Sequence, residues 1–124
     1  MVFTTTGTAA AAAAAYESEA VLPGARGVID LQYVSRSSAN PVVIYVKDTA
    51  ADGQHARARL VAWGPGGRYE WSWLTASGYN ESNQKTTYAT LSSGIERAAV
   101  EVCRFDGSVL KVCDYGAMMY NNYG

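Results

Sequence analysis

The sequence predicts an all-β protein, an antiparallel β-sandwich of about seven short strands that follows a flexible N-terminal extension. Apolar and polar residues alternate with a period of two in several short runs. Turn signals rich in glycine and proline separate these runs about every 8–12 residues. Beyond residue 27, no segment shows the periodicity of an amphipathic helix. These three observations indicate one sandwich or small-barrel domain.

The first 25 residues are a low-complexity extension in this prediction, and residues 26–124 form the sandwich domain. The extension begins with threonines and continues with seven alanines at positions 9–15. It contains too few large apolar residues to build a core alone. Three interpretations are open: the remnant of a secretory signal, a short helix that ends before Pro23, or a segment that docks in a partner.

Three runs give the first predicted strands. Residues 29–33 alternate between apolar and polar side chains, which indicates a half-buried strand. Residues 42–46 are apolar on both faces, which indicates a strand in the centre of the fold. Residues 56–63 alternate again and end at a Gly-Pro-Gly-Gly turn over residues 64–67.

The chain returns through a segment in which Tyr69, Trp71 and Trp73 are expected to share one strand face. A polar loop over residues 76–84 precedes a strand near residues 86–91, which we expect at an open sheet edge. A sandwich core commonly includes a tryptophan, which favours burial of Trp71. The residues expected in the core are Ile29, Leu31, Val43, Tyr45, Leu60, Trp71, Val100 and Val102.

A hairpin near the C-terminus carries both cysteines. Cys103 and Cys113 flank an Asp-Gly turn at residues 106–107, which predicts a disulfide between the two arms. A two- or three-residue turn does not place the cysteines opposite each other, so a longer loop or a β-bulge is required. The alternative is two free buried thiols. A disulfide would indicate a secreted protein, because such bonds persist in oxidising compartments.

The composition excludes several classes of partner. The formal net charge is −1 and the isoelectric point is about 5.7. A chain with this charge has no electrostatic field to attract nucleic acid or an anionic membrane surface. No apolar run approaches the roughly 18–20 residues of a membrane-spanning helix. We therefore expect neither nucleic-acid binding nor a membrane span.

The residues capable of catalysis or metal binding are few and scattered. His55 is the single histidine, and no nucleophile-elbow motif accompanies it. One histidine and two cysteines do not supply four zinc ligands. Asp48 and Asp52 resemble calcium ligands only faintly and equally fit Asx turns. Glu70 is the best carboxylate for glycoside hydrolysis but more simply faces solvent. The sequence predicts a protein that is not an enzyme and uses no cofactor or metal.

Aromatic residues are the remaining candidates for a binding surface. The chain has nine tyrosines and three tryptophans. Tryptophan and tyrosine dominate protein-binding hot spots, and their rings also stack on sugars. The candidates for an aromatic binding surface are Tyr69, Trp73 and Tyr79.

Residues 52–113 carry a recognisable order of motifs. An Asp-Gly-Gln-His motif leads into a strand with Arg57 and Arg59, then a strand with Trp71 and Trp73, a Ser-Gly-Ile turn and the cysteine hairpin. This half of the chain resembles small secreted β-sandwich proteins of actinobacteria, among them UmbB-like adaptors of umbrella toxin particles. The resemblance implies a non-catalytic adaptor. Such a protein joins a lectin-bearing subunit to the stalk of an extracellular antibacterial assembly.

In the implied adaptor, the N-terminal extension provides one attachment to another protein subunit. An extended segment can dock as an added strand and become ordered when it binds. The partner-binding residues in this hypothesis are Thr4, Thr5, Thr6, Tyr16, Val21 and Leu22. Two other functions are open: a carbohydrate- or cell-wall-binding module with a glycan ligand, and a self-assembling filament subunit whose extension completes its neighbour.

Overall fold

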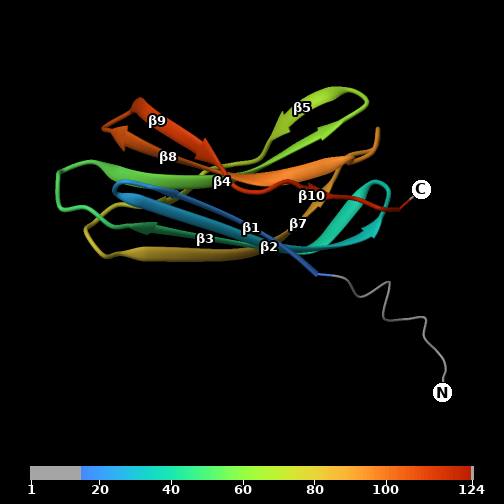
Figure 1. Ribbon diagram of the computed structural model, residues 1–124, viewed down its shortest axis with the longest axis horizontal. Helices are drawn as coiled ribbons and strands as arrows, with labels where there is room; N and C mark the ends of the chain where they lie inside the picture. The colour runs from blue at the N-terminus through green and yellow to red at the C-terminus, as the bar shows by residue number, and fades with distance from the viewer. Residues whose placement is uncertain (1–14, 124) are drawn as a thin grey trace, which may run out of the picture.

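The computed structural model describes residues 15–123, which form two antiparallel β-sheets packed against each other (Figure 1). The predicted all-β sandwich is confirmed. Sheet A has the strand order β1-β2-β3-β7, and sheet B has the order β10-β8-β4-β5, with β6 also paired to β4 and β9 to β8. Sheet A comprises β1 (Ala15–Leu22), β2 (Ala25–Ser35), β3 (Ser38–Asp48) and β7 (Ser82–Thr90). Sheet B comprises β4 (His55–Gly64), β5 (Gly67–Glu70), β6 (Leu74–Ala76), β8 (Arg97–Asp106), β9 (Val109–Tyr115) and β10 (Met119–Tyr120).

The described residues hold ten strands, compared with about seven expected from the sequence. β1 comes from a segment that the prediction left in the extension. β6 and β10 are three and two residues long, too short to produce a periodic signal. Among residues 15–123, β7 is the last strand of sheet A, so the expected open edge near residues 86–91 is confirmed for this part of the chain.

The core lies between the inner faces of the two sheets. Ile29 and Leu31 of sheet A and Leu60, Val100 and Val102 of sheet B are buried there, as the alternating pattern predicts. Each strand contributes every second residue to this layer, because successive side chains point to opposite faces.

Strand β3 presents the opposite face to the one predicted. Val43 and Tyr45 were expected in the core but are half-buried on the outer face of sheet A. A register shift between Ala39 and Val42 gives β3 one residue more than β7 over this interval. One extra residue exchanges the two faces of the strand beyond it. The core residues of β3 beyond the shift are Val42, Ile44 and Val46.

Residues 15–22 are part of the sandwich, which corrects the prediction of a flexible extension over this stretch. They pair antiparallel with β2 along their whole length, from Ala15 opposite Gln32 to Leu22 opposite Ala25. The side chains of Ala20 and Leu22 are buried in the common core. The order of this segment comes from an open sheet edge, since β1 pairs with β2, and does not require another chain.

Strand β1 also contacts sheet B. The fully buried Ser18 Oγ accepts a hydrogen bond from the Val100 N–H at 3.1 Å, and the Gly116 N–H donates to the Val100 carbonyl at 2.9 Å. Val100 lies between the residues of β8 that pair with β9 and those that pair with β10. A Cβ on Gly116 would lie 2.3 Å from Ser18 Oγ, so only glycine fits there. Ser18 and Gly116 thus complete the hydrogen bonds of β8.

The C-terminal segment is fixed to both sheets. The Tyr33 hydroxyl of β2 donates to the carbonyl of Met119 at 2.5 Å, while Met119 pairs with Ala98 of β8. Burial raises the pKa of the Tyr33 hydroxyl, which keeps it a hydrogen-bond donor. Asn121 Nδ2 donates to the carbonyl of Ser35 at 3.0 Å. The end of the described chain therefore bridges the two layers.

We expect Leu60→Ala to lower the free energy of unfolding by about 2–5 kcal/mol, because it removes a buried side chain and leaves a cavity. Leu60 is 2% exposed. Leu110→Ala is the matched control, since Leu110 is exposed on β9 and should change stability by less than about 0.5 kcal/mol. Urea denaturation measures both values, and equal losses would contradict the core assignment.

Ser18→Ala should lower the free energy of unfolding by about 1–3 kcal/mol, because it leaves the buried Val100 N–H without an acceptor. Ser82→Ala is the control, since Ser82 is an exposed serine on β7. A Ser18→Ala protein as stable as this control would show that β1 does not complete the hydrogen bonds of β8.

Candidate functional site

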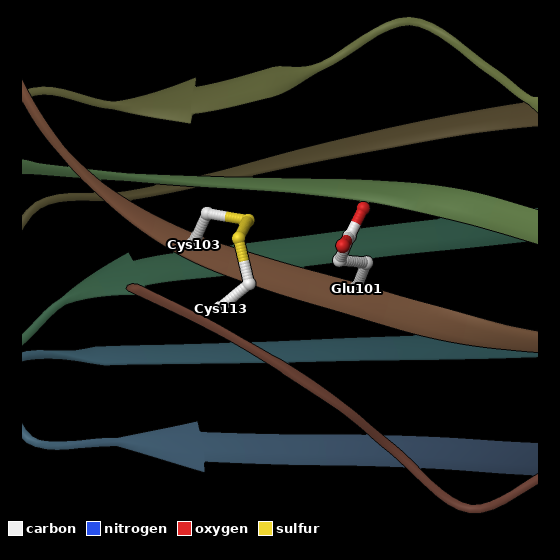
Figure 2. Close-up of side chains that lie close together, drawn as sticks. All are labelled: Glu101, Cys103 and Cys113. Carbon is white, nitrogen blue, oxygen red and sulfur yellow. A yellow bond between two sulfur atoms is a disulfide. The ribbon is translucent and has the colours of Figure 1, made fainter. Parts of the chain in front are cut away.

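The predicted disulfide is present. Cys103 of β8 and Cys113 of β9 lie directly opposite each other, with 4.1 Å between their Cα atoms and 2.00 Å between their sulfurs (Figure 2). Their opposition depends on a register shift between Arg104 and Phe105, where β9 contains the extra residue Lys111. A β-bulge was one of the two arrangements that the sequence allowed. The disulfide fixes β9 to the sheet at its middle.

Glu101 lies beside the disulfide, on the same face of β8 (Figure 2). One ligand-type atom from each of Glu101, Cys103 and Cys113 falls within 4.8 Å of the others. The sulfurs are bonded to each other and offer no thiolate to a metal ion. The carboxylate of Glu101 accepts hydrogen bonds from Arg59 at 2.8 Å and Arg68 at 3.4 Å. The cluster is therefore an ion-pair site in which two arginines compensate a nearly buried carboxylate.

Arginines and aromatic rings cover the outer face of sheet B. The Arg57 guanidinium lies 4.3 Å from the centroid of the Phe105 ring, and that of Arg59 lies 3.9 Å from the Trp73 ring. Trp73 meets Phe105 edge-on, with 5.4 Å between ring centroids. Cation–π contacts contribute roughly 0.5–2 kcal/mol each, depending on their desolvation. This arginine–aromatic layer consists of Arg57, Arg59, Arg68, Arg97, Trp63, Trp73, Phe105 and Tyr115.

The other half of the arginine–aromatic layer holds the end of β9. Arg68 donates a hydrogen bond to the Tyr115 hydroxyl at 2.7 Å, and Tyr115 packs against Trp63 with 5.9 Å between centroids. The Arg97 guanidinium lies 5.0 Å from the Trp63 ring. Glu70 faces solvent, as predicted, and a hydrogen bond from Arg68 lowers its pKa. Tyr115 is thereby tied to side chains from β4 and β5.

The residues that the sequence analysis weighed for catalysis and calcium binding have structural partners. His55 Nε2 accepts a hydrogen bond from Arg57 Nε at 2.9 Å, and the His55 ring stacks on Phe105 at 5.7 Å. In this arrangement Nε2 is not free to take a proton from a nucleophile. Asp48 and Asp52 each accept a hydrogen bond from the backbone N–H two residues further on, at 3.1 and 3.0 Å. Both aspartates therefore form Asx turns.

The aromatic candidates do not share one face. Tyr69 of β5 lies opposite Ala62, which belongs to the core, and the partly buried Trp71 packs against that core. The strand ends before Trp71, and Trp73 lies in the arginine–aromatic layer on the outer face. The prediction that Tyr69, Trp71 and Trp73 share one face is therefore wrong, because alternation holds only within a continuous strand. Tyr79 is exposed in the loop before β7.

The N-terminal candidates for partner binding differ in their accessibility. Tyr16 is half-buried and packs against Tyr33 with 5.5 Å between ring centroids. Leu22 is buried in the core of its own domain, so its predicted role in partner binding is wrong. Val21 is exposed on β1. Three further candidates lie outside the described residues: Thr4, Thr5 and Thr6.

The sequence prediction did not single out the apolar surface of β9. Val109, Leu110 and Val112 are 59%, 49% and 46% exposed, and Tyr115 is also exposed. Within residues 15–123, β9 pairs with β8 alone, so its other edge is open. The run Val-Leu-Lys-Val predicts a strand but not its exposure, which depends on how far the hairpin extends beyond the sandwich core.

No protein-family model matches the sequence, and no curated protein matches it. Between residues 15 and 123, the structure has no helix long and apolar enough to cross a membrane.

We expect intact mass measurements to show Cys103 and Cys113 oxidised together, with alkylation only after reduction. The bond joins residues ten apart in sequence, and closing a loop of that size stabilises the fold by about 2–3 kcal/mol in the chain-entropy model. The double variant Cys103→Ala/Cys113→Ala should lose about this much in urea denaturation. Reductant should lower the free energy of unfolding of the wild type and leave that of the double variant unchanged. Alkylation of both thiols without reductant would contradict the assignment.

Proposed function

We propose that this protein is a non-catalytic interaction module of an extracellular assembly and binds another protein along the open edge of β9. The observation that carries this proposal is an exposed apolar edge strand held in place by a disulfide. Disulfides persist in oxidising compartments, which supports secretion. The engaged Nε2 of His55 and the bonded cysteines support a non-catalytic role.

The open edge of β9 has what a partner strand requires. An edge strand presents unpaired backbone N–H and C=O groups, and an added strand satisfies them. Covering Val109, Leu110 and Val112 would contribute about 25 cal/mol for each Å² of apolar surface removed from water. Lys111 and Asp114 are the charged residues of β9. They favour a partner strand that carries the opposite charges at the facing positions.

The attachment of β9 to the sandwich favours binding. The disulfide fixes the middle of the strand, and Arg68 and Trp63 hold Tyr115 at its end. A strand that is ordered before binding loses little conformational entropy when a partner adds to it. The ion pairs and cation–π contacts on the outer face of sheet B therefore raise the affinity for a partner indirectly, because they hold β9 in position.

An adaptor needs a second attachment, and the other sheet offers a separate edge. β7 ends sheet A, and its side chains are mostly exposed and polar. Two open edges on different sheets allow two partners to bind without competing for one strand. The resemblance of residues 52–113 to UmbB-like adaptors suggests a secreted toxin particle as the assembly. Residues 1–14, which precede β1, are a further candidate attachment in this proposal.

The double variant Leu110→Lys/Val112→Lys tests the β9 edge, because two added charges oppose burial of this strand. Tagged protein would be incubated with culture supernatant of the producing organism, and captured proteins quantified by mass spectrometry. The matched control is Val34→Lys, which places lysine at an exposed valine of β2. We expect recovery of the partner to fall at least about tenfold for the double variant alone.

Hydrogen exchange on the captured complex gives the second readout. The backbone N–H groups of residues 109–114 that point away from β8 should exchange more slowly in the complex than in the free protein, because a partner strand accepts their hydrogen bonds. A double variant that captures the same partner as the wild type would overturn the β9 assignment.

The N-terminal attachment requires a deletion that spares β1. Removing residues 1–22 would also remove Ser18, Ala20 and Leu22 from the buried structure, and would therefore destabilise the domain itself. Deletion of residues 1–14 leaves β1 intact. We expect this shorter deletion to keep the stability of the wild type in urea and to lose one captured partner. Unchanged capture would exclude the N-terminal segment as an attachment.

A further inference from the structure

The outer face of sheet A contains a hollow of about 290 Å³ that crosses three neighbouring strands. It lies on the opposite side of the sandwich from the arginine–aromatic layer, since its residues are on the solvent face of β2, β3 and β7. Its volume lies just below the lower end of the range for ligand sites, about 300 Å³, and the hollow is open to solvent. Its lining residues are Arg26, Val28, Asp30, Val43, Tyr45 and Gln84.

The floor of the hollow is apolar. Val28 of β2 lies directly opposite Tyr45 of β3, and Val43 is the next outward residue of β3. Val28 is only 9% exposed although it lies on the outer face of its sheet. The solvent face of an antiparallel sheet is usually polar. Val28 is therefore almost covered, and the half-buried Val43 and Tyr45 supply the apolar contact area of the floor.

The rim of the hollow is polar and contains both donors and acceptors. Arg26 and Asp30 flank Val28 along β2, and Gln84 lies opposite Tyr45 on β7. Arg26 is held by Glu19, with 2.5 Å between Nε and Oε2, and lies 5.7 Å from the centroid of the Tyr45 ring. A guanidinium donates only, a carboxylate accepts and a side-chain amide does both.

We propose that this hollow binds a neutral saccharide, with the apolar face of one sugar ring on Tyr45 and Val43 and its hydroxyls directed to Arg26, Asp30 and Gln84. A pyranose matches this arrangement because it combines an apolar C–H face with a ring of hydroxyl groups, each of which both donates and accepts. This site is independent of the protein partner proposed at β9.

The charge distribution around the hollow favours no ionic ligand. The carboxylates of Glu17, Glu19 and Asp30 share this face with two cations, Arg26 and Lys47, which lie directly opposite each other on β2 and β3. Glu17 lies directly opposite Asp30 in the pairing of β1 with β2, and hydrogen bonding to Asp30 and the charge of Asp30 raise the pKa of Glu17. Three negative and two positive charges leave a net charge of only −1 on this face, and Arg26 pairs with Glu19. Neither an anion nor a cation is strongly attracted, and a neutral ligand needs no such attraction.

Titration of the full chain with cellobiose, maltose and N,N′-diacetylchitobiose, followed by ¹H–¹⁵N NMR, tests the proposal. We expect one of these disaccharides to shift the amide signals of residues 26–30, 43–45 and 84 with a Kd of about 1 mM or below. Absence of shifts in these residues with all three disaccharides would overturn the proposal. So would shifts confined to the arginine–aromatic layer.

Two variants locate the site. Tyr45→Ala removes the ring of the floor, and Gln84→Ala removes a rim amide on an exposed strand, where folding is not affected. We expect each to weaken binding about tenfold or more. Tyr79→Ala is the matched control, since it removes an exposed tyrosine of the loop before β7, one of the aromatic candidates from the sequence. Loss of binding in Tyr79→Ala, with the hollow variants unaffected, would contradict the site.

The natural ligand can be either a free oligosaccharide or part of a cell-wall polymer. Sedimentation with insoluble cellulose and chitin separates them. Wild-type protein that shifts with a disaccharide and also sediments with the matching polymer binds the wall glycan, and Gln84→Ala should then stay in the supernatant. Protein that shifts but does not sediment binds free sugar. Both results support the site, whereas sedimentation that Gln84→Ala does not reduce would overturn it.

Discussion

The pairing of β8 on both sides is the constraint on which the rest of the structure depends. β4 pairs with one side of β8 over residues 97–105, whereas three separate segments share the other side. β9 pairs with residues 101–106, Ser18 and Gly116 bond to Val100, and β10 pairs with the first residues of the strand. Buried backbone groups need partners, so these segments must meet along one strand. This requirement brings β1, the hairpin and the C-terminal segment together.

The same constraint explains why β9 extends into solvent without separating from the sandwich. Side chains of β9 are exposed on both faces, so burial contributes little to its position. The strand is held by its ladder with β8, by the disulfide and by the contacts of Tyr115 with Arg68 and Trp63. A covalent bond and a hydrogen-bonded aromatic residue replace the apolar packing that fixes the other strands. An open edge is thus kept in a defined geometry.

The sequence was sufficient for the fold class and for the cysteine hairpin, because alternation and turn chemistry are local signals. It failed at β1, where the inward positions include Ser18 and Ala20. These small residues, next to an alanine run, give no apolar periodicity. It also failed in β3 and around Trp73, where a bulge and a strand end break the alternation. Neither break can be recognised from one sequence, because both depend on the neighbouring strand.

The two surfaces proposed for binding could not be predicted from the sequence, for a different reason. The hollow joins residues of β2, β3 and β7 between positions 26 and 84, and only the register of sheet A makes them neighbours. In the sequence, the apolar residues of β9 have the pattern of a buried strand, and only the structure shows that they are exposed. The hollow belongs to sheet A and β9 to sheet B, so the core separates them. A ligand in one leaves the other accessible, as a module that joins two components requires.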